Sequence, residues 1–230
     1  IRDQPRSRGL GDVYKRQRLG LLLIITPVLG FLGWALNGGP TTPAGDMEGG
    51  YGAFAMEFVG ANTDQLHIAM GVAALGFGLL TACLMGLRAK ILDKGASQSA
   101  FLAGTLLVIG FAATVVENGA YSAGAQLVNK ELVPEAVSMF TVATTAGGIG
   151  TAIFALGIGL LGFSMFQNET VHKISSSFYM LVGIYGVIGS ILFYDQGLIG
   201  LYYISLVITT VAIGIELLRT GTCLLYTSDA

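Results

Sequence analysis

The stretch SAFLAGTLLVIGFAATVV, residues 99–116, contains no charged side chain. A helix rises about 1.5 Å per residue, so a run of this length nearly crosses the roughly 30 Å hydrocarbon core of a bilayer. Its apolar residues are continuous and do not alternate with polar ones, which argues against a strand of a membrane β-barrel. We therefore predict a transmembrane helix here.

Five more predominantly apolar segments are at least as long: 19–36, 64–87, 135–163, 174–194 and 198–218. Over the whole chain 53% of the residues are hydrophobic and 11% are charged, whereas soluble domains average about 25% charged residues. The sequence predicts an all-α, polytopic integral membrane protein, with a single six-helix domain from residue 18 to residue 221. Apolar residues at helical spacing in 51–62 also predict a short interfacial helix on the outer side, with a bend at Gly60.

The two ends differ from the rest of the chain. Residues 1–17 are polar and aperiodic, and residues 222–230, TCLLYTSDA, do not continue the pattern before them. Both strings resemble translated sequencing-adapter read-through, so we expect a non-native or disordered N-terminal extension and a non-native C-terminal tail. We assign no function to Cys223 or to the charged residues of these ends.

The loops predict an orientation. Alternating the loops across a membrane puts six basic residues on one side and Lys130 on the other; the six are Arg18, Arg88, Lys90, Lys94, Lys173 and Arg219. Because basic loops stay in the cytoplasm, we expect both termini there, in a cell inner (plasma) membrane. The opposite, outer side collects most of the acidic residues.

His67 is the titratable residue with the most chemical potential. Asp64 precedes it by one helical turn, and Glu57 and Glu117 are expected at the same outer level. A histidine beside carboxylates can bind a divalent cation or act as a general base. The favoured interpretation is structural: Asp64 caps its helix, His67 lies at the headgroup boundary, and Glu117 is solvated where Asn118-Gly119 ends a helix.

Small residues mark the fourth and fifth predicted spans. Gly147, Gly148 and Thr151 lie within 135–163, and Gly183, Gly186 and Gly189 repeat every three residues within 174–194. Small residues at such spacing let helix backbones approach closely in lipid. We expect these faces to pack helices within the chain, against another membrane protein or against a second copy.

The interiors of the predicted spans contain essentially no charged residue, which argues against a proton-coupled pump, a voltage sensor or a carrier of charged substrates. The chain has no Cys-x-x-Cys pair, no His-Glu-x-x-His motif and no paired mid-helix histidines. We therefore predict no cofactor and no nucleic-acid partner; the bilayer is the expected environment. In hydropathy, though not in motifs, the chain is similar to bacterial multi-span proteins in general.

Three functional hypotheses follow, in order of preference. The first is a non-enzymatic structural or accessory membrane subunit. The second is a carrier or channel for a small neutral solute. The third is a membrane enzyme or metal-binding protein with an outer-facing site near His67. Convergence of His67, Glu57 and Glu117 in one cavity would favour the third, and a cavity between the helices would favour the second.

Overall fold

The computed structural model describes the backbone of residues 5–36, 44–95 and 97–226, and the side chains of residues 14–35, 44–95 and 97–219. Within these ranges it is all-α. Six helices are long and apolar enough to cross a membrane: α1 (Pro5–Leu36), α3 (Gly60–Leu92), α4 (Gln98–Val128), α5 (Val133–Gln167), α6 (Lys173–Leu192) and α7 (Ile199–Tyr226). Each predicted span coincides with a different one of these helices, so the six-helix membrane bundle is confirmed.

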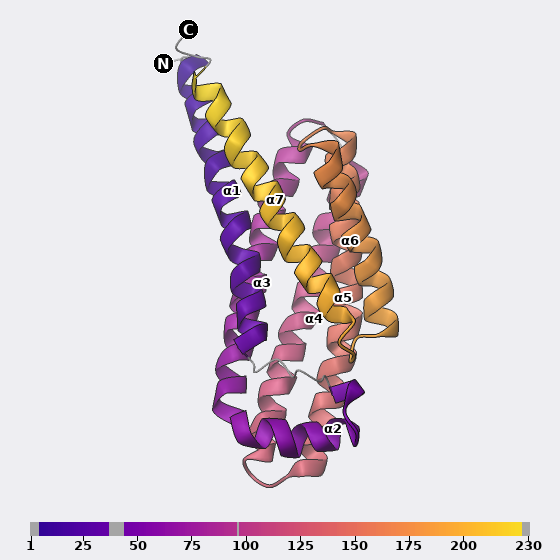
Figure 1. Cartoon of the computed structure of the whole chain (residues 1–230). Helices are drawn as coiled ribbons and strands as arrows, with labels where there is room; N and C mark the ends of the chain where they lie inside the picture. The colour runs from indigo at the N-terminus through magenta and orange to yellow at the C-terminus, as the bar shows by residue number, and fades with distance from the viewer. Residues whose placement is uncertain (1–4, 37–43, 96, 227–230) are drawn as a thin grey trace.

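The long helices form a closed ring. Each contacts the next in the order α1, α3, α4, α5, α6, α7, and α7 closes the ring against α1. Successive helices run in opposite directions, so both chain ends lie at one end of the bundle (Figure 1). We call this the termini end. The opposite end is made by residues 44–63, the α4–α5 turn at 129–132 and the α6–α7 turn at 193–198, and we call it the acidic end.

A short helical segment crosses the acidic end before α3 begins (Figure 1). It comprises η1 (Ala44–Asp46), α2 (Gly50–Ala53) and η2 (Phe54–Val59). Phe54, Ala55 and Val59 are buried and Glu57 is exposed, so the short helix expected at 51–62 has the predicted buried face. The segment thereby forms one boundary of the bundle interior.

The bend that follows this segment was predicted at the wrong residue. Helical geometry breaks at Asn62, with φ −137° and ψ 27°, and not at Gly60. The Asn62 amide donates to the Phe58 carbonyl at 2.9 Å, and the Thr63 hydroxyl donates to the Val59 carbonyl at 3.0 Å. These bonds satisfy carbonyl groups beside the break. Asp64 lies inside α3 and does not cap it.

Three helices, α1, α4 and α7, extend well beyond the predicted spans. The expected loop from 117 to 134 is wrong for most of its length, because α4 continues through Asn118-Gly119 to Val128 and the turn is confined to 129–132. Similarly, α1 begins at Pro5 and α7 ends at Tyr226, so the described parts of both suspected foreign ends are helical. Adding residues to an existing helix is far easier than starting a new one. Residues 1–4 and 227–230 lie outside the described residues, and a foreign origin of the ends stays a prediction.

Close backbone contact joins α5 to α6. A Cβ atom placed on Gly183 would overlap the backbone nitrogen of Gly159 and lie 2.5 Å from its Cα and 2.7 Å from the Ala155 carbonyl oxygen. One turn further along α6, a Cβ on Gly186 would overlap the ring of Tyr202, and a Cβ on Gly189 would lie 3.3 Å from Ile199. These α6 glycines face other helices of the same chain, so this face is not free for a partner protein.

Candidate functional site

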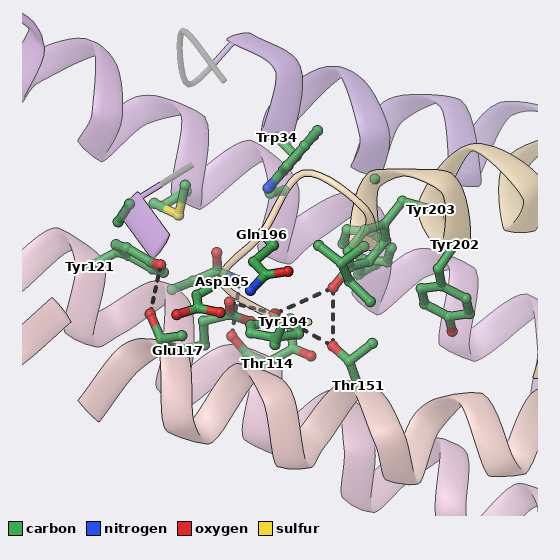
Figure 2. Close-up of a pocket in the computed structure, with 18 of the residues that line it drawn as sticks. Trp34, Thr114, Glu117, Tyr121, Thr151, Tyr194, Asp195, Gln196, Tyr202 and Tyr203 are labelled. Carbon is green, nitrogen blue, oxygen red and sulfur yellow. Dashed lines mark hydrogen bonds between the residues drawn. The ribbon is translucent and has the colours of Figure 1, made fainter. Parts of the chain in front are cut away.

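A cavity of about 120 Å³ lies inside the ring, toward the acidic end. Its walls come from α1, the segment at 44–54, α3, α4, α5, the α6–α7 turn and α7. Figure 2 shows Tyr194, Asp195 and Gln196 entering it from the α6–α7 turn, opposite Thr114 and Glu117 of α4. The cavity is therefore assembled from almost every element of the fold.

Helix α4 contributes an inward stripe of side chains. Phe111, Thr114, Asn118 and Tyr121 line the cavity at intervals of three or four residues, and Glu117 lies among them. This is the spacing of one helix face. The prediction that Glu117 lies at a solvated helix end is therefore wrong. Glu117 lies on the inner face of a helix that continues for eleven residues beyond it, to Val128.

The Glu117 carboxylate belongs to a chain of hydrogen bonds. The Tyr194 hydroxyl donates to Glu117 Oε1 at 2.6 Å. Because the Tyr194 proton points to Glu117, the Tyr194 oxygen can accept a hydrogen bond from Tyr203, at 3.3 Å, or from Thr151, at 3.5 Å. The hydroxyls of Tyr203 and Thr151 are 3.0 Å apart (Figure 2). The four residues come from α4, α5, the α6–α7 turn and α7, so this network ties the cavity walls together.

Tyr194 remains a hydrogen-bond donor across the ordinary pH range. Burial, and after it the nearby Glu117 carboxylate and Tyr203, raises the pKa of the Tyr194 phenol well above its usual value. A phenol with a raised pKa stays protonated and neutral. The short contact is therefore a hydrogen bond from a neutral phenol to a carboxyl oxygen of Glu117.

Aromatic rings form much of the remaining wall. Tyr203 stacks on Trp34 with ring centroids 6.0 Å apart and meets the edge of Phe77 at 5.9 Å. On the other side of Glu117, the Tyr121 hydroxyl is 3.1 Å from that of Thr144. The cavity therefore combines extended apolar and π surface with a small group of oxygen atoms.

The segment at 44–46 is hydrogen-bonded to the α6–α7 turn beside the cavity. The Gly45 amide donates to the Asp195 carbonyl at 3.0 Å, and the Asp46 carboxylate accepts from the Gly197 amide at 2.9 Å. Gly45 lies directly against Asp195, because a Cβ on Gly45 would be 2.6 Å from the Asp195 carboxyl carbon. These contacts hold two chain-distant segments together at one boundary of the cavity.

Gly147 makes room for the buried carboxylate. A Cβ atom on this residue would overlap the Glu117 carboxyl group and lie 2.5 Å from the Tyr194 hydroxyl. A Cβ on the neighbouring Gly148 would lie 3.3 Å from the Ser190 carbonyl oxygen and 3.4 Å from Tyr194. Of the small residues singled out in the sequence, Gly147 and Thr151 thus belong to the cavity network as well as to helix packing.

The other candidate residues do not join this site. His67, Asp64 and Glu57 are exposed, and none of them lines the cavity that contains Glu117. Asp64 lies instead in a shallow surface depression formed by residues 60–65 and Asn129. Among the described residues no group of three or more His, Cys, Asp or Glu side chains is placed to hold a metal ion. The geometry does not assemble the site imagined around His67.

No protein-family model, curated protein or solved structure matches this chain. The class therefore follows from the fold and the cavity alone. The chain is a multi-pass helical membrane protein whose bundle encloses an aromatic cavity with a carboxylate on its wall.

Proposed function

We propose that this chain is a non-enzymatic membrane protein that binds a small solute in the cavity at the acidic end. The observation that carries the proposal is the cavity itself, about 120 Å³ in volume and lined by both aromatic rings and a hydroxyl–carboxylate network. An apolar cavity of roughly 150 Å³ holds benzene. By this comparison, the natural ligand has about six non-hydrogen atoms or fewer. This favours the solute-binding hypothesis over a purely structural role.

Binding fits the interior better than free passage does. Toward the termini end the ring is filled by side chains with no solvent exposure, among them Leu84, Leu87, Ile91, Ala103, Leu107 and Leu161. Interiors packed in this way leave no path for a solute. A transport cycle would have to separate these side chains. In the described conformation, a solute would therefore reach the cavity from the acidic end.

The orientation in the membrane is part of the proposal. The six basic residues counted above lie toward the termini end, either in the nearer halves of α1, α3 and α7 or at the turns beside them, and Lys130 lies in the turn at the acidic end. The positive-inside rule then places the termini end in the cytoplasm and the acidic end outside. In an inner (plasma) membrane, the cavity would receive solutes from outside the cell.

Cysteine labelling in intact cells tests this orientation. Glu48 and Asp93 are both exposed and lie at opposite ends of the bundle. In a background with Cys83→Ala and Cys223→Ser, we expect Glu48→Cys to react with a membrane-impermeant maleimide and Asp93→Cys to react only after the cells are opened. The reverse pattern would overturn the orientation and leave the cavity untouched.

Trp34 provides a direct test of solute binding. It is the single tryptophan of the chain and lines the cavity, so its fluorescence reports on the site without a label. In maltoside micelles we expect small solutes such as tert-butanol to change Trp34 fluorescence along a saturable curve. Affinity is expected to be weak, because ligand efficiency is bounded at about 1.5 kcal/mol per non-hydrogen atom.

A matched pair of variants separates binding from solvent effects. Thr114 lines the cavity and Thr105 is exposed, and both are threonines of α4 whose hydroxyls bond back to the preceding turn. Thr114→Phe should fill the cavity and abolish the saturable change, whereas Thr105→Phe should leave it unaltered. A linear response in the native protein, or identical curves for the two variants, would refute solute binding.

A further inference from the structure

The cavity wall carries two carboxyl groups without a basic counterpart. Glu117 and Asp195 both line it, and among its described lining residues there is no Lys, Arg or His. The ion pair between Lys173 and Glu169 lies at the termini end, away from the cavity. A charge withdrawn from water needs compensation by an opposite charge or by several hydrogen bonds. Glu117 is compensated in part by Tyr194 alone, through one oxygen.

The aromatic walls have the same electrostatic preference. Tyr203 contacts both Trp34 and Phe77, and all three rings line the cavity. The faces of aromatic rings carry partial negative charge and attract cations, with tryptophan the strongest of them. The rings and the carboxylates therefore both favour a positively charged ligand.

We infer that the ligand of this cavity is a small organic cation, of the alkylammonium class. The inference rests on the proposed function, since it names the kind of solute that the cavity binds. The ammonium group would lie beside Glu117 and pair with the carboxyl group that already accepts a hydrogen bond from Tyr194. Its alkyl groups would contact the rings of Trp34, Phe77 and Tyr203.

A bare metal cation fits these walls less well. Hard cations take about six or more oxygen ligands, and the rings occupy the surface on which such ligands would have to lie. Glu117, Thr151, Tyr194 and Tyr203 are also bonded to one another. An alkylammonium ion can contact both the oxygen atoms, through its ammonium group, and the aromatic rings, through its alkyl groups. The expectation that charged substrates are excluded is thus revised, because it assumed that Glu117 lay outside the helices.

The test compares two solutes of the same shape, tert-butylammonium and tert-butanol. Both are titrated against the full chain in maltoside micelles and phosphate buffer, free of other amines, with Trp34 fluorescence as the readout. We expect the cation to bind at least about tenfold more tightly than the alcohol, as a charge-assisted contact and cation–π attraction together imply.

Substitution of Glu117 identifies the source of the preference. Glu117→Gln keeps the shape of the side chain and a hydrogen-bond acceptor for Tyr194, and should reduce the cation-to-alcohol affinity ratio to about one. The far-UV circular dichroism spectrum of the variant should match that of the native chain, which shows that the variant is folded. The control is Glu57→Gln, an exposed position, which should keep the native ratio.

The possible results separate the two proposals. Equal binding of both solutes by the native chain would overturn the cationic ligand and leave the solute-binding function standing. A preference that survives in Glu117→Gln would overturn the assignment to Glu117. If neither solute gives a saturable change, the cavity does not bind solutes of this size and both proposals fall.

Discussion

Replacing Gly183 by alanine should lower the free energy of unfolding by about 2 to 3 kcal/mol, a large effect for one methyl group. The added Cβ would overlap the Gly159 nitrogen and lie within 2.7 Å of the Ala155 carbonyl oxygen. These are backbone atoms, so the conflict cannot be relieved by turning a side chain, and α5 and α6 must separate. Reversible unfolding in mixed micelles, followed by far-UV circular dichroism, measures the loss.

Gly159 offers a matched control at the same crossing. A Cβ on Gly159 would meet Gly183 at 3.6 Å and the Met180 carbonyl at 3.8 Å, which are ordinary contact distances. Gly159→Ala should therefore be neutral, or stabilising by up to about 1 kcal/mol through helix propensity. Equal effects of the two substitutions would contradict the geometry of this crossing.

Replacing Gly147 by alanine should damage the site more than the fold. The new methyl group would displace the Glu117 carboxyl group and the Tyr194 hydroxyl, which are ends of side chains and can move. The displaced carboxyl group would no longer lie beside the ammonium group of the ligand, and loss of a hydrogen bond to a charged group costs about 1.5 to 3 kcal/mol. The affinity for tert-butylammonium, measured by Trp34 fluorescence, should therefore fall by about tenfold or more.

The control for this prediction lies on α4. Gly119 is two residues from Glu117 but is exposed, and a Cβ there meets no atom within 4 Å. Gly119→Ala should bind solutes as the native chain does. Unchanged affinity in Gly147→Ala would mean that the contact between Glu117 and Tyr194 does not shape the cavity.

The helix bundle could be predicted because lipid imposes a simple rule. A segment such as 99–116 must satisfy its backbone groups internally, so an apolar run of this length is a helix whatever surrounds it. The same rule does not say where the helix ends. At Asn118-Gly119 the turn propensity of two residues is outweighed by the packing of Asn118, which is buried and bonded to the Thr114 carbonyl at 2.9 Å.

The candidate site was partly within reach of the sequence. Phe111, Thr114, Asn118 and Tyr121 repeat at helical spacing around Glu117, which indicates a continuing helix with an inward polar stripe. The period of buried residues on α3, through Leu66, Met70 and Ala73, likewise puts His67 on the outer face. At Glu117 the signal was outweighed by the Asn118-Gly119 turn motif, whereas for His67 the favoured interpretation was already a structural one.

The rest of the site depends on tertiary structure. Tyr194 reaches Glu117 across 77 positions of sequence, and no local pattern specifies that pairing. Gly147 has the spacing of a packing residue, and its second role as space for a carboxylate becomes visible when α4 and α5 are placed side by side.

The most direct test of the account is access to Thr114 inside the cavity. In the background without native cysteines, Thr114→Cys should react with a small cationic methanethiosulfonate reagent, and tert-butylammonium should slow the reaction. Leu107→Cys, two turns away on α4 and fully buried in the core, should remain unmodified under the same conditions. An unreactive Thr114→Cys, or equal reaction at both positions with no protection by the solute, would contradict a solute site at the acidic end.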